Sequence, residues 1–438
     1  MAMPRPRGFV AVLSVGLLFA TAGVAAGATA TTSRESVNSN GGQADSFSEM
    51  PSISADGRYV TFVSDSSNLV AGDTNGRTDV FVRDRQAGTT SRVSVSSHGN
   101  QANRGSDMPS ISADGRFVVF VSVATNLVPG DTNGMGDVFV RDRQAGTTSR
   151  VNVDSNGDQA DGEGFNPTIS ADGRFVAYSS GASNLVDGDT NDTYDVFVRD
   201  RQTGTTSRVS VRSNGDQANN VSYTPSISAD GGSVAFVSLA SNLVPGDTNG
   251  QADVFVRDRQ AGTTTRVNVS SDGHQAAKRR SEKPSISADG RFVAFNSLAA
   301  NLVPGDMYGK ADVFVHDLQT GTTSLVSRRS DGTQVNWPSL DPTISADGRF
   351  VAFRSGAAKL VAGDTNRKTD VFVRDRQTGT TSLVSVRSNG AQANANCDND
   401  TPSISADGQF VAFASFASNL VPGDTNGQTD VFVRGPLN

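Results

Sequence analysis

Short apolar blocks recur along the chain, and none of them has the period of an amphipathic helix. In one stretch the blocks cover residues 109–114, 116–122, 137–142 and 147–153. An Asp-Gly dipeptide joins the first two blocks, as in a tight hairpin. The second block is apolar on both faces, which indicates that other sheets cover it, and the fourth is apolar on one face. The pattern predicts a unit of four β-strands.

This unit repeats along the chain. The string Ile-Ser-Ala-Asp-Gly recurs at intervals of 58 to 60 residues, beginning at Ile53, Ile111, Ile169, Ile227, Ile286, Ile344 and Ile404. Small four-stranded sheets covered on both faces and repeated in this way are typical of propeller blades. We therefore predict an all-β fold, a seven-bladed β-propeller of four-stranded antiparallel blades. An open solenoid is the alternative, but it needs distinct polar caps, which this sequence lacks.

The two ends of the chain indicate how the ring closes. Residues 31–37 match the fourth-strand sequence of residues 147–153, and the chain stops soon after a third strand at residues 430–434. The last blade therefore lacks its own fourth strand, while the N-terminus has a spare one. We predict that the N-terminal strand pairs into blade 7, which removes an exposed sheet edge.

The first thirty residues have the pattern of an export signal. Arg5 and Arg7 precede an apolar stretch at residues 9–26, and small residues of the Ala-x-Ala type follow. The stretch is shorter than the ~20 residues of a membrane-spanning helix. We predict a secretory signal peptide at 1–30, a single propeller domain at 31–438, no membrane span after cleavage, and a secreted protein, extracellular or periplasmic.

Composition narrows the possible partners. The net charge is −7 and no long basic cluster is present, so nucleic acid is not an expected partner. The single cysteine excludes an intrachain disulfide, and the three histidines occupy unrelated repeat positions. Phenylalanine is abundant, with 23 residues against 5 Tyr and 1 Trp, but most of it recurs at fixed strand positions. We assign that excess to packing of the scaffold.

The repeat resembles a known family. The string Pro-Ser-Ile-Ser-Ala-Asp-Gly-Arg-Phe-Val-Ala-Phe, followed by Asp-Val-Phe-Val and Gln-Thr-Gly-Thr-Thr, is similar to the WD-type propeller repeat of the TolB family. The resemblance covers residues 31–438. Alanine replaces the usual proline before Asp-Gly, and no separate N-terminal α/β domain is present. The resemblance implies the propeller fold and a place in the cell envelope.

A second conserved feature within the chain is an acidic loop between the second and third strands of each copy. Two aspartates flank an asparagine in an Asp-x-Asn-Gly-x-x-Asp pattern, which gathers the hard oxygen ligands that calcium prefers. The alternative is that these side chains only cap local turns. Tyr308 replaces asparagine in the fifth copy, which would be the weakest site. The candidate calcium ligands are Asp73, Asn75, Asp79, Asp131, Asn133, Asp137, Asp189, Asn191, Asp195, Asp247, Asn249, Asp253, Asp364, Asn366, Asp370, Asp424, Asn426 and Asp430.

The segments before each first strand differ from copy to copy. In a propeller they emerge on the same face as the acidic loops and surround the mouth of the axial channel, so we expect them to contact a ligand there. Simple drift of surface loops is the alternative. The candidate ligand-binding residues are Phe47, Glu49, Phe165, Tyr223, Lys278, Arg279, Arg280, Trp337, Asp398 and Asp400.

Catalytic motifs are missing from the sequence. No Gly-x-Ser-x-Gly elbow or histidine cluster is present. We therefore predict a protein that is not an enzyme: a secreted, monomeric, non-catalytic scaffold that binds a protein, peptide or glycan, with calcium as a candidate ion. The alternative is a propeller-type polysaccharide lyase or glycoside hydrolase, in which channel-mouth carboxylates act as acid and base.

Overall fold

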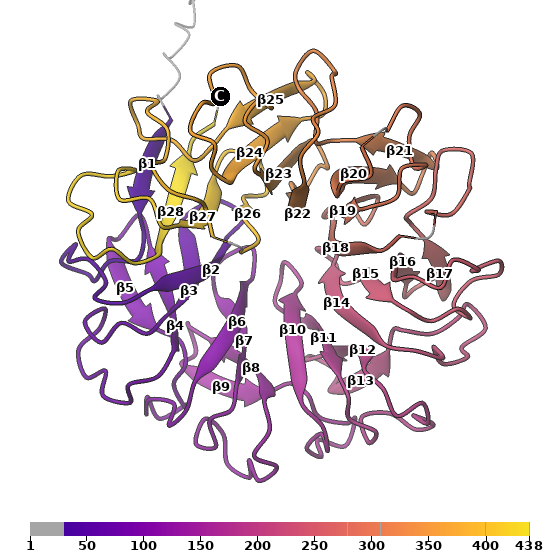
Figure 1. The fold of residues 1–438 in the computed structure, drawn as a ribbon. Helices are drawn as coiled ribbons and strands as arrows, with labels where there is room; N and C mark the ends of the chain where they lie inside the picture. Colours follow the sequence, from indigo (N-terminus) through magenta and orange to yellow (C-terminus); the bar gives the residue numbers. More distant parts are fainter. Residues whose placement is uncertain (1–29, 278, 307, 399, 438) are drawn as a thin grey trace, which may run out of the picture.

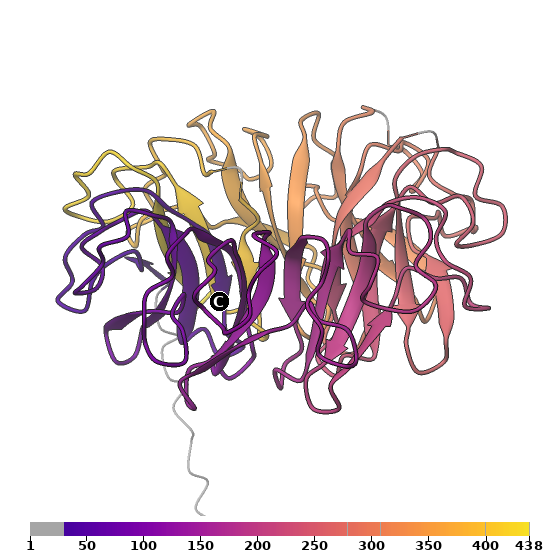
Figure 2. The ribbon, with the colours of Figure 1, turned by 90° about the horizontal axis from the view of Figure 1, so that it is seen from below.

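The computed structural model describes residues 30–277, 279–306, 308–398 and 400–437. Seven four-stranded antiparallel sheets stand around a central axis (Figure 1), and a view from the side shows them next to one another in one ring (Figure 2). The described residues contain no helix. The predicted all-β, seven-bladed propeller is therefore confirmed. No helix long and apolar enough to cross a membrane is found among these residues.

The blades are numbered in chain order, and each sheet runs outward from the axis in strand order. The innermost strands are β2 (Ser48–Ile53), β6 (Ser106–Ile111), β10 (Gly164–Ile169), β14 (Ser222–Ile227), β18 (Ser281–Ile286), β22 (Ser339–Ile344) and β26 (Ser403–Ile404). The second strands are β3 (Tyr59–Ser64), β7 (Phe117–Ser122), β11 (Phe175–Ser180), β15 (Ser233–Ser238), β19 (Phe292–Ser297), β23 (Phe350–Ser355) and β27 (Val411–Ser415).

The two outer positions are equally regular. The third strands are β4 (Asp79–Asp84), β8 (Asp137–Asp142), β12 (Asp195–Asp200), β16 (Asp253–Asp258), β20 (Asp312–Asp317), β24 (Asp370–Asp375) and β28 (Asp430–Gly435). The fourth strands are β5 (Thr89–Arg92), β9 (Thr147–Arg150), β13 (Thr205–Arg208), β17 (Thr263–Arg266), β21 (Thr322–Leu325), β25 (Thr380–Leu383) and β1 (Thr31–Arg34).

The ring closes as predicted. Strand β1 pairs antiparallel with β28, with Thr31 opposite Gly435 and Arg34 opposite Phe432, so blade 7 is built from both ends of the chain. Side chains reinforce the junction, because the hydroxyl of Ser36 donates to Asp430 Oδ1 at 2.5 Å. The predicted signal peptide lies outside the described residues, apart from Ala30.

The core consists of aliphatic and phenylalanine side chains between neighbouring blades. In each blade the second and third strands contribute a stacked, buried aromatic pair, such as Phe62 with Phe81, whose ring centroids lie 5.8 Å apart. One continuous cluster joins Val80 and Val93 of blade 1 to Val118 and Phe139 of blade 2. The excess of phenylalanine is therefore mostly scaffold, as the sequence indicated.

Backbone hydrogen bonds also tie the blades together where the first strand turns into the second. The amide of Ala55 donates to the carbonyl of Ala113 at 3.0 Å, and the series continues from blade to blade until Ala406 donates to Ala55 at 3.0 Å. The seven bonds form a closed belt around the axis. The acidic loops and the segments before each first strand lie together at the opposite end of the blades. For example, Gln101 in the segment before β6 contacts Asp73 in the acidic loop of blade 1.

In five blades the arginine just before the second strand pairs with the aspartate that ends the third strand. Arg58 binds Asp84 through two nitrogens, at 2.7 and 3.0 Å. These hydrogen bonds hold the pKa of Asp84 and of Asp142 down, to about 2 in both cases. The ion pairs fix the third strand against the second.

Candidate functional site

The variable segments are not all loops. The innermost strands begin about three residues earlier than predicted, at Ser106 rather than residue 109, and the fourth strands end earlier, at Arg150. Glu49, Phe165 and Tyr223 therefore lie within strands β2, β10 and β14, beside the axis (Figure 1). The proline in each strand marked the predicted start, because proline cannot donate to a ladder.

A β-bulge explains how these strands accommodate proline. The register of β2 with β3 shifts between Glu49 and Ser52, and Met50 has a positive φ of 53°. The same left-handed conformation recurs in the first six blades, at Met50, Met108, Asn166, Thr224, Lys283 and Asp341. Positive φ is costly for side chains other than glycine. The bulge turns the residues before each proline out of the regular ladder, toward the axis.

Three carboxylates meet where blade 7 adjoins blade 1. Oxygen atoms of Glu49, Asp398 and Asp400 all lie within 4.8 Å of one another, and all three side chains are half-buried. The backbone amide of Met50 donates to Asp400 Oδ2 at 2.7 Å, and Thr429 Oγ1 donates to Asp398 Oδ2 at 3.3 Å. The structure thus brings together three of the predicted ligand-binding residues, from opposite ends of the chain.

The short innermost strand of blade 7 makes this meeting possible. Strand β26 has only two residues, so the preceding segment is held instead by the bridge between Cys397 and Ser415 and by the amide of Asp398, which donates to Ala414 O at 3.0 Å. Among the described residues just before β26 none has a positive φ, in contrast to the corresponding segments of the other six blades. Blade 7 brings two carboxylates, Asp398 and Asp400, to the cluster, and blade 1 brings one, Glu49.

Burial, together with the crowding of like charges, governs the electrostatics of this acidic cluster. Burial, followed by the charges of Asp400 and Asp398, raises the pKa of Glu49 to about 7. Burial also raises the pKa of Asp400, with Asp398 adding to the effect and the backbone bond from Met50 opposing it. Asp107, on blade 2, raises the pKa of both groups. The ionised form of these carboxylates is therefore destabilised, because they are partly buried and lie close to one another.

Sequence reasoning missed one neighbour of the cluster. Arg354 on β23 bonds to Asp341 on β22, and its charge lies close enough to lower the pKa of Asp400. The signal was present: the repeat position of Arg354 holds Val63 in blade 1 and Ala414 in blade 7. Blades 3 and 5 hold Ser179 and Asn296 there, so Arg354 is the one charged residue at a position that is otherwise apolar or neutral.

The other predicted ligand-binding residues do not join the cluster. Phe165 packs edge-on against Tyr194 at 5.0 Å, on blade 3. Tyr223, half-buried on blade 4, lies close enough to Arg280 and Glu282 for both charges to act on its pKa, which burial raises. Phe47 is half-buried, Arg279 is exposed, and Lys278 lies outside the described residues.

Trp337 lies in a separate place. It is 56% exposed and lines a cavity of about 490 Å³ on blade 6, together with Arg329, Lys359 and Arg367. The predicted residues therefore surround the ring at several places, and only the acidic cluster gathers several of them.

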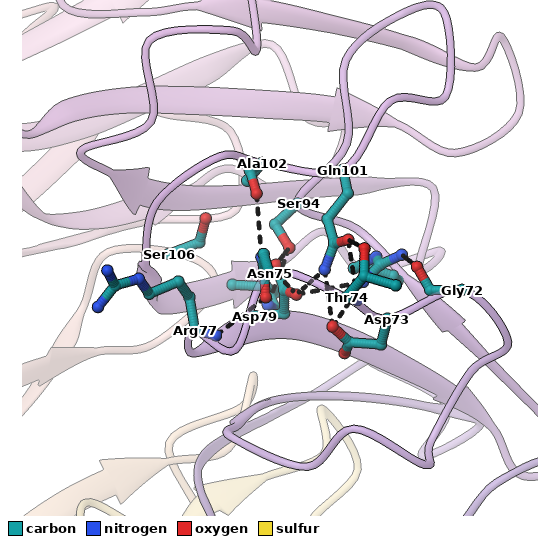
Figure 3. A network of polar contacts seen from close by, with 12 residues as sticks. Gly72, Asp73, Thr74, Asn75, Arg77, Asp79, Ser94, Gln101, Ala102 and Ser106 are labelled. Atoms are coloured by element: carbon teal, nitrogen blue, oxygen red, sulfur yellow. Dashed lines mark hydrogen bonds and ion pairs between the residues drawn. The ribbon is translucent and has the colours of Figure 1, made fainter.

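The predicted calcium loops hold side-chain donors. In blade 1, Figure 3 shows Asp73 and Asp79 around the amide of Gln101, whose Nε2 lies 2.7 and 3.1 Å from them. Asn75 Nδ2 donates to Asp79 at 3.2 Å, while its Oδ1 accepts from the amide of Arg77 at 2.9 Å. These contacts are the ones that the turn interpretation predicts.

An arginine from the fourth strand completes this network. Arg92 Nη1 lies 3.2 Å from Asp73 and 3.3 Å from Asp79, whose carboxylate is fully buried. Four more blades repeat the arrangement, through Arg150, Arg208, Arg266 and Arg34. In these blades a guanidinium occupies the place where a calcium ion would have to bind. Calcium at the loops stays a prediction.

Comparisons with known proteins show what shares this fold. No family model and no curated protein matches the chain. An oligogalacturonate lyase in complex with manganese is similar over 94% of this chain and 91% of its own, with 12% identity and a TM-score of 0.54. The propeller domain of the trilobed protease from Pyrococcus furiosus is similar over 89% and 95%, with 10% identity and a TM-score of 0.53. A TolB-type protein from Agrobacterium tumefaciens is similar over 79% and 94%, with 16% identity and a TM-score of 0.43.

These similarities establish a shared propeller fold. The propeller repeat predicted from the sequence is confirmed at the level of the fold. The predictions of a non-catalytic scaffold and of a protein that is not an enzyme are wrong, because proteins that share the fold over nearly their whole length include a lyase. The lyase or hydrolase alternative is the one that the comparisons favour. The absence of known catalytic motifs misled the prediction, because such an absence does not exclude catalysis.

Proposed function

We propose that the protein is an enzyme that cleaves an acidic, uronate-containing oligosaccharide with the help of a divalent cation held by the acidic cluster. The observation that carries this proposal is the convergence of Glu49, Asp398 and Asp400 within 4.8 Å. The similar fold of a manganese-bound oligogalacturonate lyase supports the choice of substrate class.

The cluster fits a hard divalent cation. All its donors are carboxylate oxygens, the ligands that suit manganese, magnesium and calcium. Without a cation the three groups repel one another, and the raised pKa of Glu49, about 7, reflects that repulsion together with burial. Glu49, Asp398 and Asp400 would hold the ion, and Arg354 would limit the negative charge from the side of Asp400.

The proposed reaction is β-elimination. A bound cation supplies a Lewis acid that attracts the substrate carboxylate and increases the acidity of the adjacent C–H bond. A base takes that proton, the electron pair of the C–H bond forms a carbon–carbon double bond, and the glycosidic C–O bond breaks. The departing oxygen takes up a proton. One product is an unsaturated uronate.

The chain's own residues have separate roles in this proposal. We assign proton acceptance to Asp107, which lies on the innermost strand of blade 2, close enough to act on Glu49 and Asp400. Phe165 occupies the corresponding position of blade 3 and offers an apolar ring to a sugar face. The predicted export signal and monomeric state complete the proposal: the protein acts on a glycan outside the cytoplasm.

The test is cleavage of a uronate oligosaccharide by the purified protein, with manganese and with a chelator. Manganese-dependent appearance of the unsaturated product, followed by ultraviolet absorbance, supports the proposal. Glu49→Gln should slow the reaction by about 100-fold or more, since it removes one ligand. Glu282→Gln is the matched control, because Glu282 occupies the same repeat position on blade 5 and pairs with Arg280 at 3.4 Å.

Two outcomes would contradict the proposal. One is a folded protein that releases no product from uronate oligosaccharides at any manganese concentration. The other is equal activity of Glu49→Gln and wild type. New reducing ends without an unsaturated product would replace elimination by hydrolysis and so reject the assigned chemistry.

A further inference from the structure

Two blades lack the arginine that neutralises the outer acidic loop. In blades 5 and 6 the fourth strand ends in Leu325 and Leu383, where blade 1 has Arg92. The aspartate pairs remain, so each of these blades buries two carboxylates without the guanidinium that the rest of the ring supplies. Burying a carboxylate without an opposite charge or a hydrogen-bond donor destabilises the fold. The two blades differ in whether a side-chain amide supplies such a donor.

Blade 5 compensates with an amide. Gln334 Nε2 donates to Asp306 Oδ1 at 2.8 Å and to Asp312 Oδ2 at 3.0 Å, bridging the pair much as Gln101 does in blade 1. Both aspartates therefore keep a shared donor, although the guanidinium is gone.

Blade 6 has no such compensation. Gln392 is turned away: its Nε2 donates to the carbonyl of Gly363 at 2.8 Å, and its Oε1 accepts from the amide and the hydroxyl of Thr365, each at 3.2 Å. By distance and angle, both carboxylate oxygens of Asp364 and Oδ2 of Asp370 accept no hydrogen bond, although Asn366 and Gln392 lie close enough to oppose the rise that burial causes in the pKa of these carboxylates.

These unpartnered oxygens are deeply buried. Asp364 is 6% exposed and Asp370 is 0% exposed. Among the described residues, no ion pair joins either carboxylate to a lysine or arginine. Asp364 also lines a cavity of about 500 Å³ between the acidic loop and Thr381 of the fourth strand, so the position can be reached from solvent. The acidic pair of blade 6 is thus buried and has no ion pair to a basic residue, and one of its members, Asp364, lines a cavity.

We propose that the outer loop of blade 6 binds a calcium ion between Asp364 and Asp370, in the place that a guanidinium takes in five other blades. Carboxylate oxygens that accept no hydrogen bond are hard ligands for this cation, and its charge would compensate both carboxylates. The site is structural and lies on the outer side of the ring, so it is independent of the function proposed for the acidic cluster at the axis. Calcium here replaces an arginine that the repeat has lost.

The test exchanges the cation for an arginine. In wild type, saturating calcium should raise the melting temperature by several degrees relative to chelator, because the ion binds only the folded state. Leu383→Arg should clearly reduce this calcium-dependent rise, leaving only what calcium contributes at the intact axial cluster, and should melt above wild type in chelator. The matched variant Leu325→Arg on blade 5 should keep the rise, since Gln334 already satisfies that loop.

A second variant covers the case in which Leu383→Arg does not fold. Asp364→Asn preserves shape and removes one charge, and it too should clearly reduce the calcium-dependent rise. The proposal is overturned if wild type shows no calcium-dependent rise, or if the folded Leu383→Arg or Asp364→Asn variant keeps the full rise. Because the axial cluster is intact in these variants, failure here leaves the proposed enzymatic function untouched.

Discussion

Aspartates at the axis and at the rim of this ring differ in their hydrogen-bond partners and in the charges around them. At the rim Asp79 is fully buried yet surrounded by donors from Ser94, Gln101, Asn75 and Arg92. At the axis, Asp400 accepts one backbone bond and otherwise faces other carboxylates. The rim arrangement recurs around the ring, whereas the axial one occurs once, between blades 7 and 1.

This difference indicates which residues of a repeat protein are candidates for function. Selection for a stable blade acts alike on every copy, so charges that recur tend to come with partners that also recur. A charge that appears once, against the repeat, has no scaffold role to explain it. This criterion supports our proposals that the axial cluster is the functional site and that the rim loop of blade 6, which has lost a recurring partner, binds a ligand.

The largest effect should come from deleting residues 31–38. The deletion removes the fourth strand of blade 7 together with Arg34, which lies 3.4 Å from both Asp424 and Asp430. An open sheet edge and an unneutralised acidic pair should lower the melting temperature strongly and produce oligomers, because strand edges template association. Calorimetry and light scattering measure both. An unchanged melt of a monomer would contradict the closure account.

Next in size is Arg92→Leu at the rim. It removes the guanidinium between Asp73 and Asp79 while Gln101 stays, and should lower the free energy of unfolding by about 2–4 kcal/mol. Arg77→Leu, an exposed arginine in the same loop, is the control and should change it by less than about 0.5 kcal/mol. Urea unfolding compares the two. Equal effects would mean that the rim charges are not structural partners.

The corresponding change at the axis should have the opposite sign. Glu49→Gln removes one of three mutually repelling, half-buried carboxylates, so in chelator it should raise the free energy of unfolding by up to about 1 kcal/mol. The same urea experiment measures it. A loss of stability as large as that of Arg92→Leu would erase the distinction between the two regions.

Changes of pH should distinguish the buried aspartates from those that pair with arginine. Burial raises the pKa of Asp253 to about 6 and of Asp312 to about 7, so these groups bind protons more tightly in the folded state. Stability should therefore rise as pH falls from about 8 to about 5. Asp84 and Asp142, with pKa values of about 2, act the other way, and their stabilisation is lost as pH falls below about 4 toward 2. Melting temperature should peak near pH 4 to 5; a steady rise toward pH 8 would contradict this assignment.

The fold was predictable because the same four-strand sequence pattern occurs seven times along the chain. Blade number, strand order and closure followed from Ile53 and its six repeats and from the match of residues 31–37 to a fourth strand. The strand starts were not predictable in the same way, because the bulge at Met50 lets proline stay inside the innermost strand.

The site was only partly predictable. Glu49, Asp398 and Asp400 were each recognisable as departures from the repeat, but their meeting depends on blade 7 lying next to blade 1 and on the short strand β26. The paired aspartates of the rim loops were visible in the sequence, but the arginine that neutralises them lies on the fourth strand. Which residues meet across strands depends on the register of the sheet, and the pattern of one repeat does not reveal the register.

The most direct test of the central claim is the affinity for manganese, measured from the free ion by electron paramagnetic resonance in the Leu383→Arg background, which removes the site proposed on blade 6. Adding Glu49→Gln to this background should weaken manganese binding by about 10- to 100-fold. Adding Arg77→Leu instead should leave it unchanged. Equal manganese affinity with and without Glu49→Gln would contradict the assignment of the axial carboxylates as the cation site.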